Sequence, residues 1–590
     1  MNAMNEWLEK KELERRMIKD LKRFVRVARG VEPADLVIKN ARVFRSLLGD
    51  FVEGDIAVDQ GHVAGIGSYE GRDVVDAHGR YAIPGFIDGH VHIESSMLST
   101  SEFARAVVPE GTTAVVTDPH EIANVAGIEG IRYMMDSAKD LPLGVYFTLP
   151  SCVPVTSLED NGAVLTAEDL ASLLDEPNVL GLAEFMNVPG VFFGDDEVYK
   201  KLTMKDDLLI EGHAPGVFGK DVMAYAAAGV CSDHECMTEE EARDRLAAGM
   251  DVEIREGTAA MNFEALHGVV NDRTVSNCLF VTDDRHPVDL LMRGHINSIV
   301  RSAVKAGIPV HQAILMATLS PARHFGIRDL GMIAPHYRAD LALYNDLESF
   351  MPSAVFKDGI LVAEEGALLA EMSAEVSPSI LDSVHLAPVT KESFRIPLTG
   401  TKANVMGLVP HQLLTDKRIL DVKVEDGCAV QDVERDILKL AVFERHHATG
   451  QSACALVQGF GLKRGAIAST VGHDSHNLIV IGANDDDMLA AVKEIERMHG
   501  GIAFVTEGHL LASIPLPIAG LMSTKNAQAV SMRAAEFVRI ARALGVPKEY
   551  DPLMTLAFLS LPVIPSLKLT DRGLVDVEQF KIISVDAEKE

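Results

Sequence analysis

The chain has 590 residues, too many for one ordinary domain, and its hydrophobic and charged fractions of 47% and 24% exclude a largely disordered protein. The formal net charge of −31 at pH 7 argues against nucleic acid and anionic membranes as partners. Six cysteines without a C-x-x-C pair, and an N-terminus without the apolar core of a signal peptide, predict a cytoplasmic protein with reduced thiols.

Residues 1–30 are rich in Lys, Glu and Arg and predict a charged amphipathic helix, with Leu8, Met17, Leu21 and Phe24 spaced for one face. Strand patterns follow at residues 35–45, 51–59 and 62–67, and a similar signature returns at 340–344 and 355–362. Two groups of strands that flank a long segment predict one small composite β domain, formed by residues 31–80 and 327–390.

Strands and helices alternate through the segment between these two groups, residues 81–326. We expect helices at 128–138, 168–174 and 239–248, among others. Eight β/α units in about 240 residues predict an α/β fold with a (β/α)8 barrel of the TIM type, and an open doubly wound sheet is the alternative. The eight expected strands cover residues 81–87, 113–116, 144–149, 179–183, 208–211, 229–232, 251–254 and 278–281.

A separate α/β domain is expected at residues 391–590, where strand patterns at 419–424, 437–443 and 476–481 alternate with helix patterns at 488–498 and 529–544. We find neither a phosphate-binding G-x-x-x-x-G-K-[ST] loop nor a well-placed G-x-G-x-x-G, so a nucleotide cofactor has no support.

Polar residues follow several of the predicted barrel strands at the end where barrel enzymes carry their active sites. His90 and His92 close the first strand, and their spacing of two points both imidazoles to one side. The ends of strands four, five, six and eight carry further groups: Glu184, His213, His234 and the pair Asp283-Asp284.

Each of these residues has an ordinary structural explanation when it is taken alone. A histidine at a strand end is more often a satisfied polar residue than a ligand, and Asp-Asp is a common helix N-cap. Their joint occurrence at five strand ends instead indicates a metal site. Nitrogen and oxygen donors without thiolate suit Zn, Mn or Fe, and six protein groups are enough for two bridged metal ions.

Several motifs make the chain resemble the amidohydrolase superfamily. The string Pro84–His92 (PGFIDGHVH) is similar to the strand-one signature of that superfamily, and His213, His234 and Asp283 match its positions on strands five, six and eight. The resemblance is closest to the adenine deaminase branch and covers nearly the whole chain past residue 30. The motifs similar to that branch are IESS at 93–96, DPHEIANV at 118–125, TDDR at 282–285 and VGHDSHN at 471–477.

The resemblance implies hydrolytic deamination of adenine to hypoxanthine and ammonia in purine salvage, with metal-activated water attacking C6 of the base. Two divalent metal ions per chain are implied, Mn or Fe ahead of Zn. One would be bound by His90, His92, Glu184 and Asp283, and the other by Glu184, His213 and His234. Many relatives bridge their metals with a carboxylated lysine, whereas Glu184 occupies that position here and argues against hydantoinase or dihydroorotase activity.

The other roles that the resemblance suggests are hypotheses. Asp283 would relay the proton to the leaving amine, and Glu121 or Glu235 would protonate the ring. Asp284, His120 and Glu94 are candidates for substrate contact, although His120 could be a further ligand and Glu94 could orient a ligand histidine. Asp88 is expected to be structural.

Some alternatives remain open at this stage. The substrate could be another cyclic amidine or amide, and a non-catalytic scaffold is the alternative from a different class, although no ligand position is missing. His473, Asp474 and His476 could close over the barrel, bind another metal or form only a turn. We expect a homodimer or homotetramer that acts on a small purine base.

Overall fold

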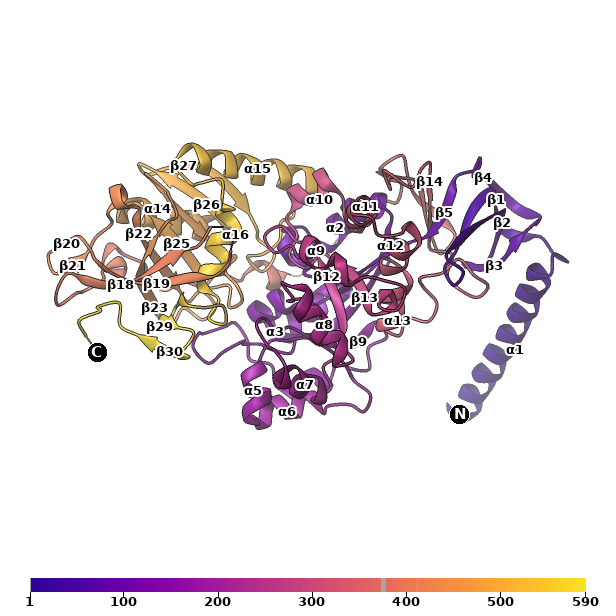
Figure 1. The fold of residues 1–590 in the computed structure, drawn as a ribbon, viewed down its shortest axis with the longest axis horizontal. Helices are drawn as coiled ribbons and strands as arrows, with labels where there is room; N and C mark the ends of the chain where they lie inside the picture. The colour runs from indigo at the N-terminus through magenta and orange to yellow at the C-terminus, as the bar shows by residue number, and fades with distance from the viewer. Residues whose placement is uncertain (1, 373–377, 411, 590) are drawn as a thin grey trace.

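The computed structural model describes residues 2–372, 378–410 and 412–589. Its parts follow one another along a long axis, with a barrel in the middle (Figure 1). Helix α1 (Asn2–Ala28) lies at one end, next to a β-sheet, and an α/β domain lies at the other end (Figure 1). The helix packs through Phe24 and Val27, whereas Leu13, Met17 and Leu21 are exposed. The side chain of Leu8 lies outside the described part of the chain.

A nine-stranded sheet joins strands from both sides of the barrel in sequence. The order is β17-β16-β15-β14-β5-β1-β2-β3, with β4 paired to β1. Strand β5 pairs in parallel with β1 and antiparallel with β14, so it links the two groups. The strands are β1 (Ala34–Arg45), β2 (Asp50–Asp59), β3 (His62–Gly67), β4 (Gly71–Asp76), β5 (Tyr81–Pro84), β14 (Leu341–Tyr344), β15 (Pro352–Lys357), β16 (Ile360–Glu364) and β17 (Ala367–Leu368).

Eight parallel strands form the central barrel. Strands β6 to β10 make one sheet and β11 to β13 another. One junction is closed where Asp283 N–H donates to the His90 carbonyl at 2.9 Å, and the other where Cys231 N–H donates to the Ile210 carbonyl at 2.9 Å. The predicted (β/α)8 fold is therefore confirmed. Its strands are β6 (Phe86–Val91), β7 (Thr112–Thr117), β8 (Gly144–Leu149), β9 (Val179–Phe185), β10 (Leu209–Gly212), β11 (Ser232–Asp233), β12 (Asp251–Arg255) and β13 (Cys278–Val281).

Two predicted barrel strands were wrong in their bounds. The run 81–87 is divided at Gly85: its first part is β5 of the nine-stranded sheet, and the barrel strand begins at Phe86. A Cβ at Gly85 would lie 2.1 Å from Thr113 Oγ1, so the glycine permits the close approach at this transition. The run 229–232 overlaps β11 only at Ser232, because Gly229 has a φ of +101° and belongs to the turn after α7.

Helices cover the outside of the barrel, as each β/α unit returns the chain to the next parallel strand. They are α2 (Thr100–Val107), α3 (His120–Ser137), α4 (Ala167–Ala171), α5 (Val188–Phe193), α6 (Asp196–Leu202), α7 (Lys220–Ala227), α8 (Glu239–Ala247), α9 (Phe263–Leu266), α10 (Pro287–Arg293), α11 (Ile296–Lys305), α12 (Val310–Met316) and α13 (Leu319–His324).

The C-terminal domain has an eight-stranded sheet in the order β19-β18-β23-β22-β25-β24-β26-β27. Helix α14 (Asp485–Met498) packs on this sheet, and α15 (Ala527–Ala543) contacts both β27 and the barrel helix α10. Helix α16 (Pro552–Ala557) follows. The strands of the domain are β18 (Lys402–Leu408), β19 (Thr415–Asp421), β20 (Val424–Glu425), β21 (Cys428–Ala429), β22 (Ile437–Phe443), β23 (Ser452–Gln458), β24 (Ala466–Ser469), β25 (Leu478–Gly482), β26 (Gly501–Thr506), β27 (His509–Pro515), β28 (Leu567–Thr570), β29 (Gly573–Asp576) and β30 (Lys581–Ile583).

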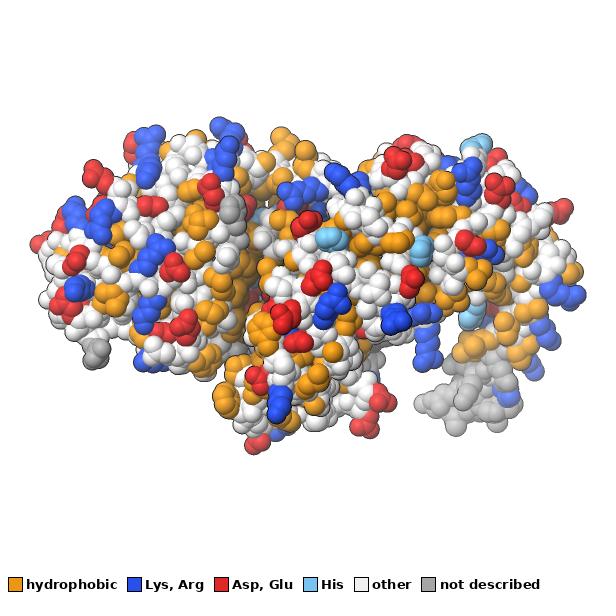
Figure 2. All heavy atoms as spheres, viewed as in Figure 1, with side chains coloured by type: hydrophobic (Ala, Val, Ile, Leu, Met, Phe, Trp, Pro, Cys, Tyr) orange, Lys and Arg blue, Asp and Glu red, His pale blue; other side chains and the backbone are white. Residues whose placement is uncertain are grey.

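The surface carries both signs of charge. On the face shown in Figure 2, acidic and basic side chains are interspersed rather than gathered into one field. Among the described residues, we find no helix that is long and apolar enough to span a membrane.

Candidate metal centre and active site

The predicted ligands meet at the C-terminal end of the barrel. They lie in or just after β6, β9, β10, β11 and β13, and all are buried except His213, which is half-buried. Several groups of residues have donor atoms close enough to share a metal ion, and two of them consist of predicted ligands: His90, His92 and Asp283, and Glu184, His213 and His234.

The first group surrounds Oδ1 of Asp283. His92 Nε2 lies 3.2 Å from this oxygen and His90 Nε2 lies 3.7 Å from it. His92 Nδ1 contacts the Asp118 carbonyl at 3.1 Å, which places the proton on Nδ1 and leaves the Nε2 lone pair facing the group. Burial lowers the pKa of His90 to about 3, and His90 Nε2 has no hydrogen-bond partner among the described residues. An orphaned, neutral imidazole nitrogen fits a metal ligand.

The second group surrounds the Glu184 carboxylate. Oε2 of Glu184 lies 2.8 Å from His213 Nδ1 and 3.1 Å from His234 Nε2, while Oε1 lies 3.4 Å from His92 Nε2. The two oxygens therefore face different groups, which is the arrangement that a bridging carboxylate requires. Burial raises the pKa of Glu184, but His120, His213 and His234 outweigh it and hold that pKa well below its usual range.

Asp88 fixes the first strand against the last. Its Oδ1 accepts the His90 N–H at 3.3 Å and the Thr282 N–H at 3.1 Å, and its Oδ2 accepts the Thr282 hydroxyl at 2.5 Å. Asp283 follows with a left-handed φ of 55°, which turns its side chain toward the histidines. Asp88 thus has the structural position expected for it.

Asp118 follows β7 and was missed in the sequence. His120 Nδ1 contacts Asp118 Oδ2 at 2.8 Å and Glu184 Oε1 at 3.2 Å, and these residues form a candidate metal group together with His92. His120 therefore lies among the candidate ligands. The same signal that found the others, a polar side chain after a barrel strand, would have found Asp118.

Arg255, the last residue of β12, was missed too. Its guanidinium contacts Asp283 Oδ2 at 2.7 Å and both oxygens of Glu235 at 2.5 and 3.1 Å. Glu235 Oε1 also lies 3.5 Å from His234 Nε2, so Glu235 is at the edge of the second group. Burial raises the pKa of Glu235, but Arg255, His213 and His234 bring it below the usual value.

Asp284 and Glu94, two predicted substrate contacts, have different surroundings from each other. Asp284 is half-buried next to Asp283 and accepts the Ser95 hydroxyl at 2.5 Å. Glu94 is buried, and its Oε1 accepts the Ile122 N–H at 3.2 Å, at the start of α3. No hydrogen bond joins Glu94 to a ligand histidine among the described residues, so the structure does not bring these two together.

The C-terminal domain reaches the barrel at Glu121, in the first turn of α3. His473 Nδ1 lies 2.8 Å from Glu121 Oε1, and His476 Nε2 contacts Glu121 Oε2. Asp474 Oδ1 lies 3.9 Å from His120 Nε2. The loop after β24 that carries these residues therefore lies over the barrel mouth, one of the alternatives left open above.

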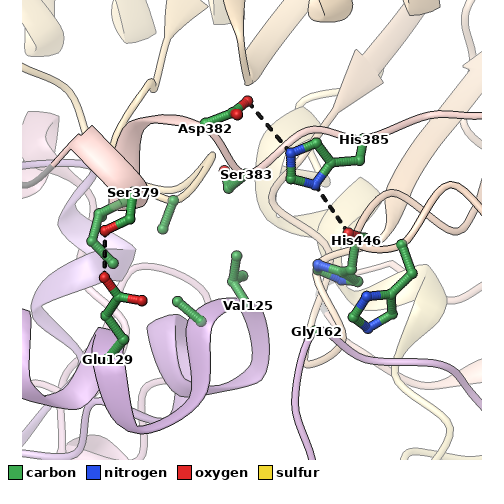
Figure 3. A pocket seen from close by; sticks show the side chains of 12 residues that line it. Val125, Glu129, Gly162, Ser379, Asp382, Ser383, His385 and His446 are labelled. Atoms are coloured by element: carbon green, nitrogen blue, oxygen red, sulfur yellow. Dashed lines mark hydrogen bonds and ion pairs between the residues drawn. The ribbon is translucent and has the colours of Figure 1, made fainter.

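A cavity of about 180 Å³ lies beside this contact, between α3 and the C-terminal domain. Figure 3 shows Glu129 of α3 joined to Ser379 on one side, and Asp382, His385 and His446 in a row on the other. The barrel and the C-terminal domain thus meet through polar side chains on this side of the site.

An eight-stranded parallel barrel with imidazole and carboxylate groups at its strand ends defines the class of metal-dependent hydrolases to which the amidohydrolases belong. The sequence profile of the amidohydrolase family matches residues 81–362, and that of the adenine deaminase C-terminal domain matches residues 412–581.

Curated relatives match over nearly the whole chain. Adenine deaminase 2 of Carboxydothermus hydrogenoformans is 53% identical over 96% of this chain and 100% of its own length. Adenine deaminase of Nitratidesulfovibrio vulgaris is 47% identical over 95% and 98%. Among solved structures, one of a D-hydantoinase is 15% identical, covering 57% of this chain and 97% of its own, with a TM-score of 0.45. The full-length identity shows that the chain belongs to the adenine deaminase family of amidohydrolases.

Proposed function

We propose that this protein hydrolyses adenine to hypoxanthine and ammonia in purine salvage, using two divalent metal ions. The observation that carries this proposal is Glu184, whose two oxygens face two separate ligand groups. Relatives of up to 53% identity that are named adenine deaminase support the choice of substrate.

The residues present fit two metals. His90, His92, Asp283 and one oxygen of Glu184 would bind the first, and His213, His234 and the other oxygen would bind the second. Imidazole and carboxylate donors suit Mn or Fe, our preferred ions, as well as Zn. When bound, the metals would lower the pKa of a water molecule and so supply the nucleophile for C6.

Asp283 is our candidate for the proton transfer from water to the leaving amine. Arg255 binds its Oδ2, so Oδ1 is left facing His90 and His92, where the water would be held. We propose that Asp283 accepts a proton from this water and passes it to the leaving amine. Water then contributes the oxygen of hypoxanthine, and the amino group departs as ammonia.

Glu121 is our candidate for the acid that protonates the purine ring, ahead of Glu235. Both oxygens of Glu235 are bound by Arg255, whose guanidinium does not release protons. Burial raises the pKa of Glu121, but His473, His120 and His476 outweigh it and hold that pKa well below its usual range, so Glu121 would be ionised. Glu121 would therefore relay a proton from His473, whose ring nitrogen contacts its Oε1, and would not supply a proton of its own. Asp284, held by Ser95, would hydrogen-bond the ring, and His120 and Glu94 remain candidates for contact with the substrate.

One experiment tests the function. The purified protein is supplied with Mn²⁺ or Fe²⁺, its metal content is measured by elemental analysis, and adenine conversion is followed by ultraviolet absorbance. About two metals per chain with turnover is the expected result. Two metals without turnover on adenine would point to another amino-purine or pyrimidine as substrate. The absence of both metal and turnover would favour the non-catalytic scaffold.

We also propose a homodimer or homotetramer in the cytoplasm, because similar enzymes commonly self-associate and all the described cysteines are free thiols. Light scattering of the purified protein measures the oligomeric state directly, and a monomer would contradict it.

A further inference from the structure

We propose that the C-terminal domain completes the active site: His473 and His476 are positioning residues that orient Glu121 at the barrel mouth. The inference rests on the proposed deaminase function and gives the loop between β24 and β25 a role in it. Glu121 lies on the barrel and the two histidines on the C-terminal domain, so the site spans two parts of the chain.

The Glu121 carboxylate is bound at both oxygens. His473 Nδ1 lies 2.8 Å from Oε1, and His476 Nε2 contacts Oε2. Glu121, His473 and His476 are each no more than 3% exposed. On the barrel side, His120 Nε2 lies 3.3 Å from Oε1, farther away than His473. A buried carboxylate with these closer contacts to the C-terminal domain has little freedom to rotate, so they set its direction.

The protonation of His476 is set by its own loop. The Gly472 N–H donates to His476 Nδ1 at 3.2 Å, so Nδ1 is an acceptor and the ring proton lies on Nε2. Nε2 is the atom that faces Glu121, which makes His476 a neutral donor to the carboxylate.

The C-terminal domain also fixes where the loop lies. Arg445, fully buried, donates to the carbonyls of Ser383 at 2.6 Å and Ala519 at 3.0 Å, and also to that of His476. His446, which lines the cavity in Figure 3, contacts the Ser475 carbonyl at 2.8 Å. Apart from Ser383, which lies in the segment before this domain, the residues that make these contacts belong to the C-terminal domain.

His473 is fixed independently of His476. Its N–H donates to the Ala557 carbonyl at 3.0 Å, and its ring stacks on Phe558 with centroids 4.3 Å apart and an interplanar angle of 25°. Each histidine is therefore held against Glu121 by its own set of contacts. A contact formed by chance would not have such support on both histidines.

A metal ion is the other occupant that this cluster suggests, because the three donor groups lie close together and Asp474 Oδ2 is buried without a hydrogen-bond partner among the described residues. The tautomer of His476 favours a hydrogen bond over a metal, because the Gly472 N–H donates to Nδ1 and so leaves Nε2, the atom that faces Glu121, with the ring proton and no free lone pair. Metal content is therefore measured together with activity.

The test is a double-mutant cycle on the full-length, metal-loaded enzyme. His476→Ala is expected to lower kcat by about 10- to 100-fold, with KM changed less than about 3-fold and two metals retained. His476→Gln keeps an N–H donor and is expected to recover most of the loss. In a Glu121→Gln background, His476→Ala is expected to change the residual kcat less than about 3-fold, because a residue that acts through Glu121 has nothing left to orient.

His385→Gln is the matched control, since His385 contacts the neighbouring His446 carbonyl but not Glu121, and it is expected to leave kcat unchanged. An equal loss of kcat in both backgrounds would overturn the proposal. So would a third metal equivalent that disappears in His476→Ala. Failure of the wild-type enzyme to turn over adenine would instead count against the proposed function, so the two failures are distinguishable.

Discussion

At the scale of single residues, the proposal of two metal ions depends on Glu184, whose two oxygens face two ligand groups. Glu184→Gln replaces one carboxylate oxygen with an amide nitrogen that cannot bind a cation. We expect the fold to remain, at least one metal to be lost and kcat to fall by about 100-fold or more. Elemental analysis and the adenine assay measure both effects, with the surface variant Glu536→Gln as control. Unchanged metal content and activity would remove Glu184 from the site.

Lys568 makes a second prediction at this scale, one of pH-dependent stability. Burial lowers its pKa from 10.5 to about 7, and its Nζ donates to the carbonyls of Leu413 and Phe558, both at 2.8 Å. Between pH 7 and 10.5 the unfolded chain binds more protons at this group than the folded chain, so stability rises with pH. The wild type should gain about 2 kcal/mol between pH 7 and 9 relative to Lys568→Met.

Urea unfolding of both metal-free proteins at several pH values measures this difference. The comparison with Lys568→Met subtracts groups that titrate in both proteins. Parallel stability curves for the two proteins would show that Lys568 keeps its ordinary pKa in the folded state.

At the scale of elements, strand ends explain what the sequence could predict and what it could not. The periodicity of apolar residues in the sequence located seven barrel strands, although β11 is shorter than expected. A search for polar residues at the strand ends found His90, His92, Glu184, His213, His234 and Asp283. Asp118 follows β7 and Arg255 is the last residue of β12, and no site residue was predicted at either strand end. The sequence pattern could not show that the run 81–87 is divided between two strands, because apolar residues suit either sheet. Only the pairing of strands in the folded protein separates β5 from β6.

Asp88 gives the prediction that belongs to this scale, because it joins β6 to β13. Asp88→Ala leaves the Thr282 N–H and hydroxyl without their buried acceptor. We expect a loss of about 2–4 kcal/mol in the free energy of unfolding. Chemical denaturation of the metal-free protein measures it, and Asp73→Ala on the exposed strand β4 is the control. A loss as small as that of the control would mean that the barrel closes without Asp88.

At the scale of the whole molecule, the sequence could not show which parts meet. Glu121 and His476 are 355 residues apart, and no local pattern carries a contact of that separation. The motifs around both residues were visible, but their contact depends on how the C-terminal domain docks. A second docking contact lies at the loop after β8, where Thr570 donates its hydroxyl to the Leu158 carbonyl at 2.7 Å and Arg572 contacts Ser157 and Asp160.

The contact between Thr570 and Leu158 can be weakened by mutation. Thr570→Val removes the hydroxyl and leaves the Leu158 carbonyl without that donor, at a cost of about 1–1.5 kcal/mol. If the C-terminal domain holds the loop closed, a glutamate-specific protease should cleave after the buried Glu159 about 5- to 10-fold faster, since cleavage follows the population of the open loop. Thr506→Val is the matched control, because the Thr506 hydroxyl has no hydrogen-bond partner among the described residues. Equal cleavage of both variants would mean that the barrel alone keeps the loop in place, and the contact at Glu121 would then be the one that couples the two parts.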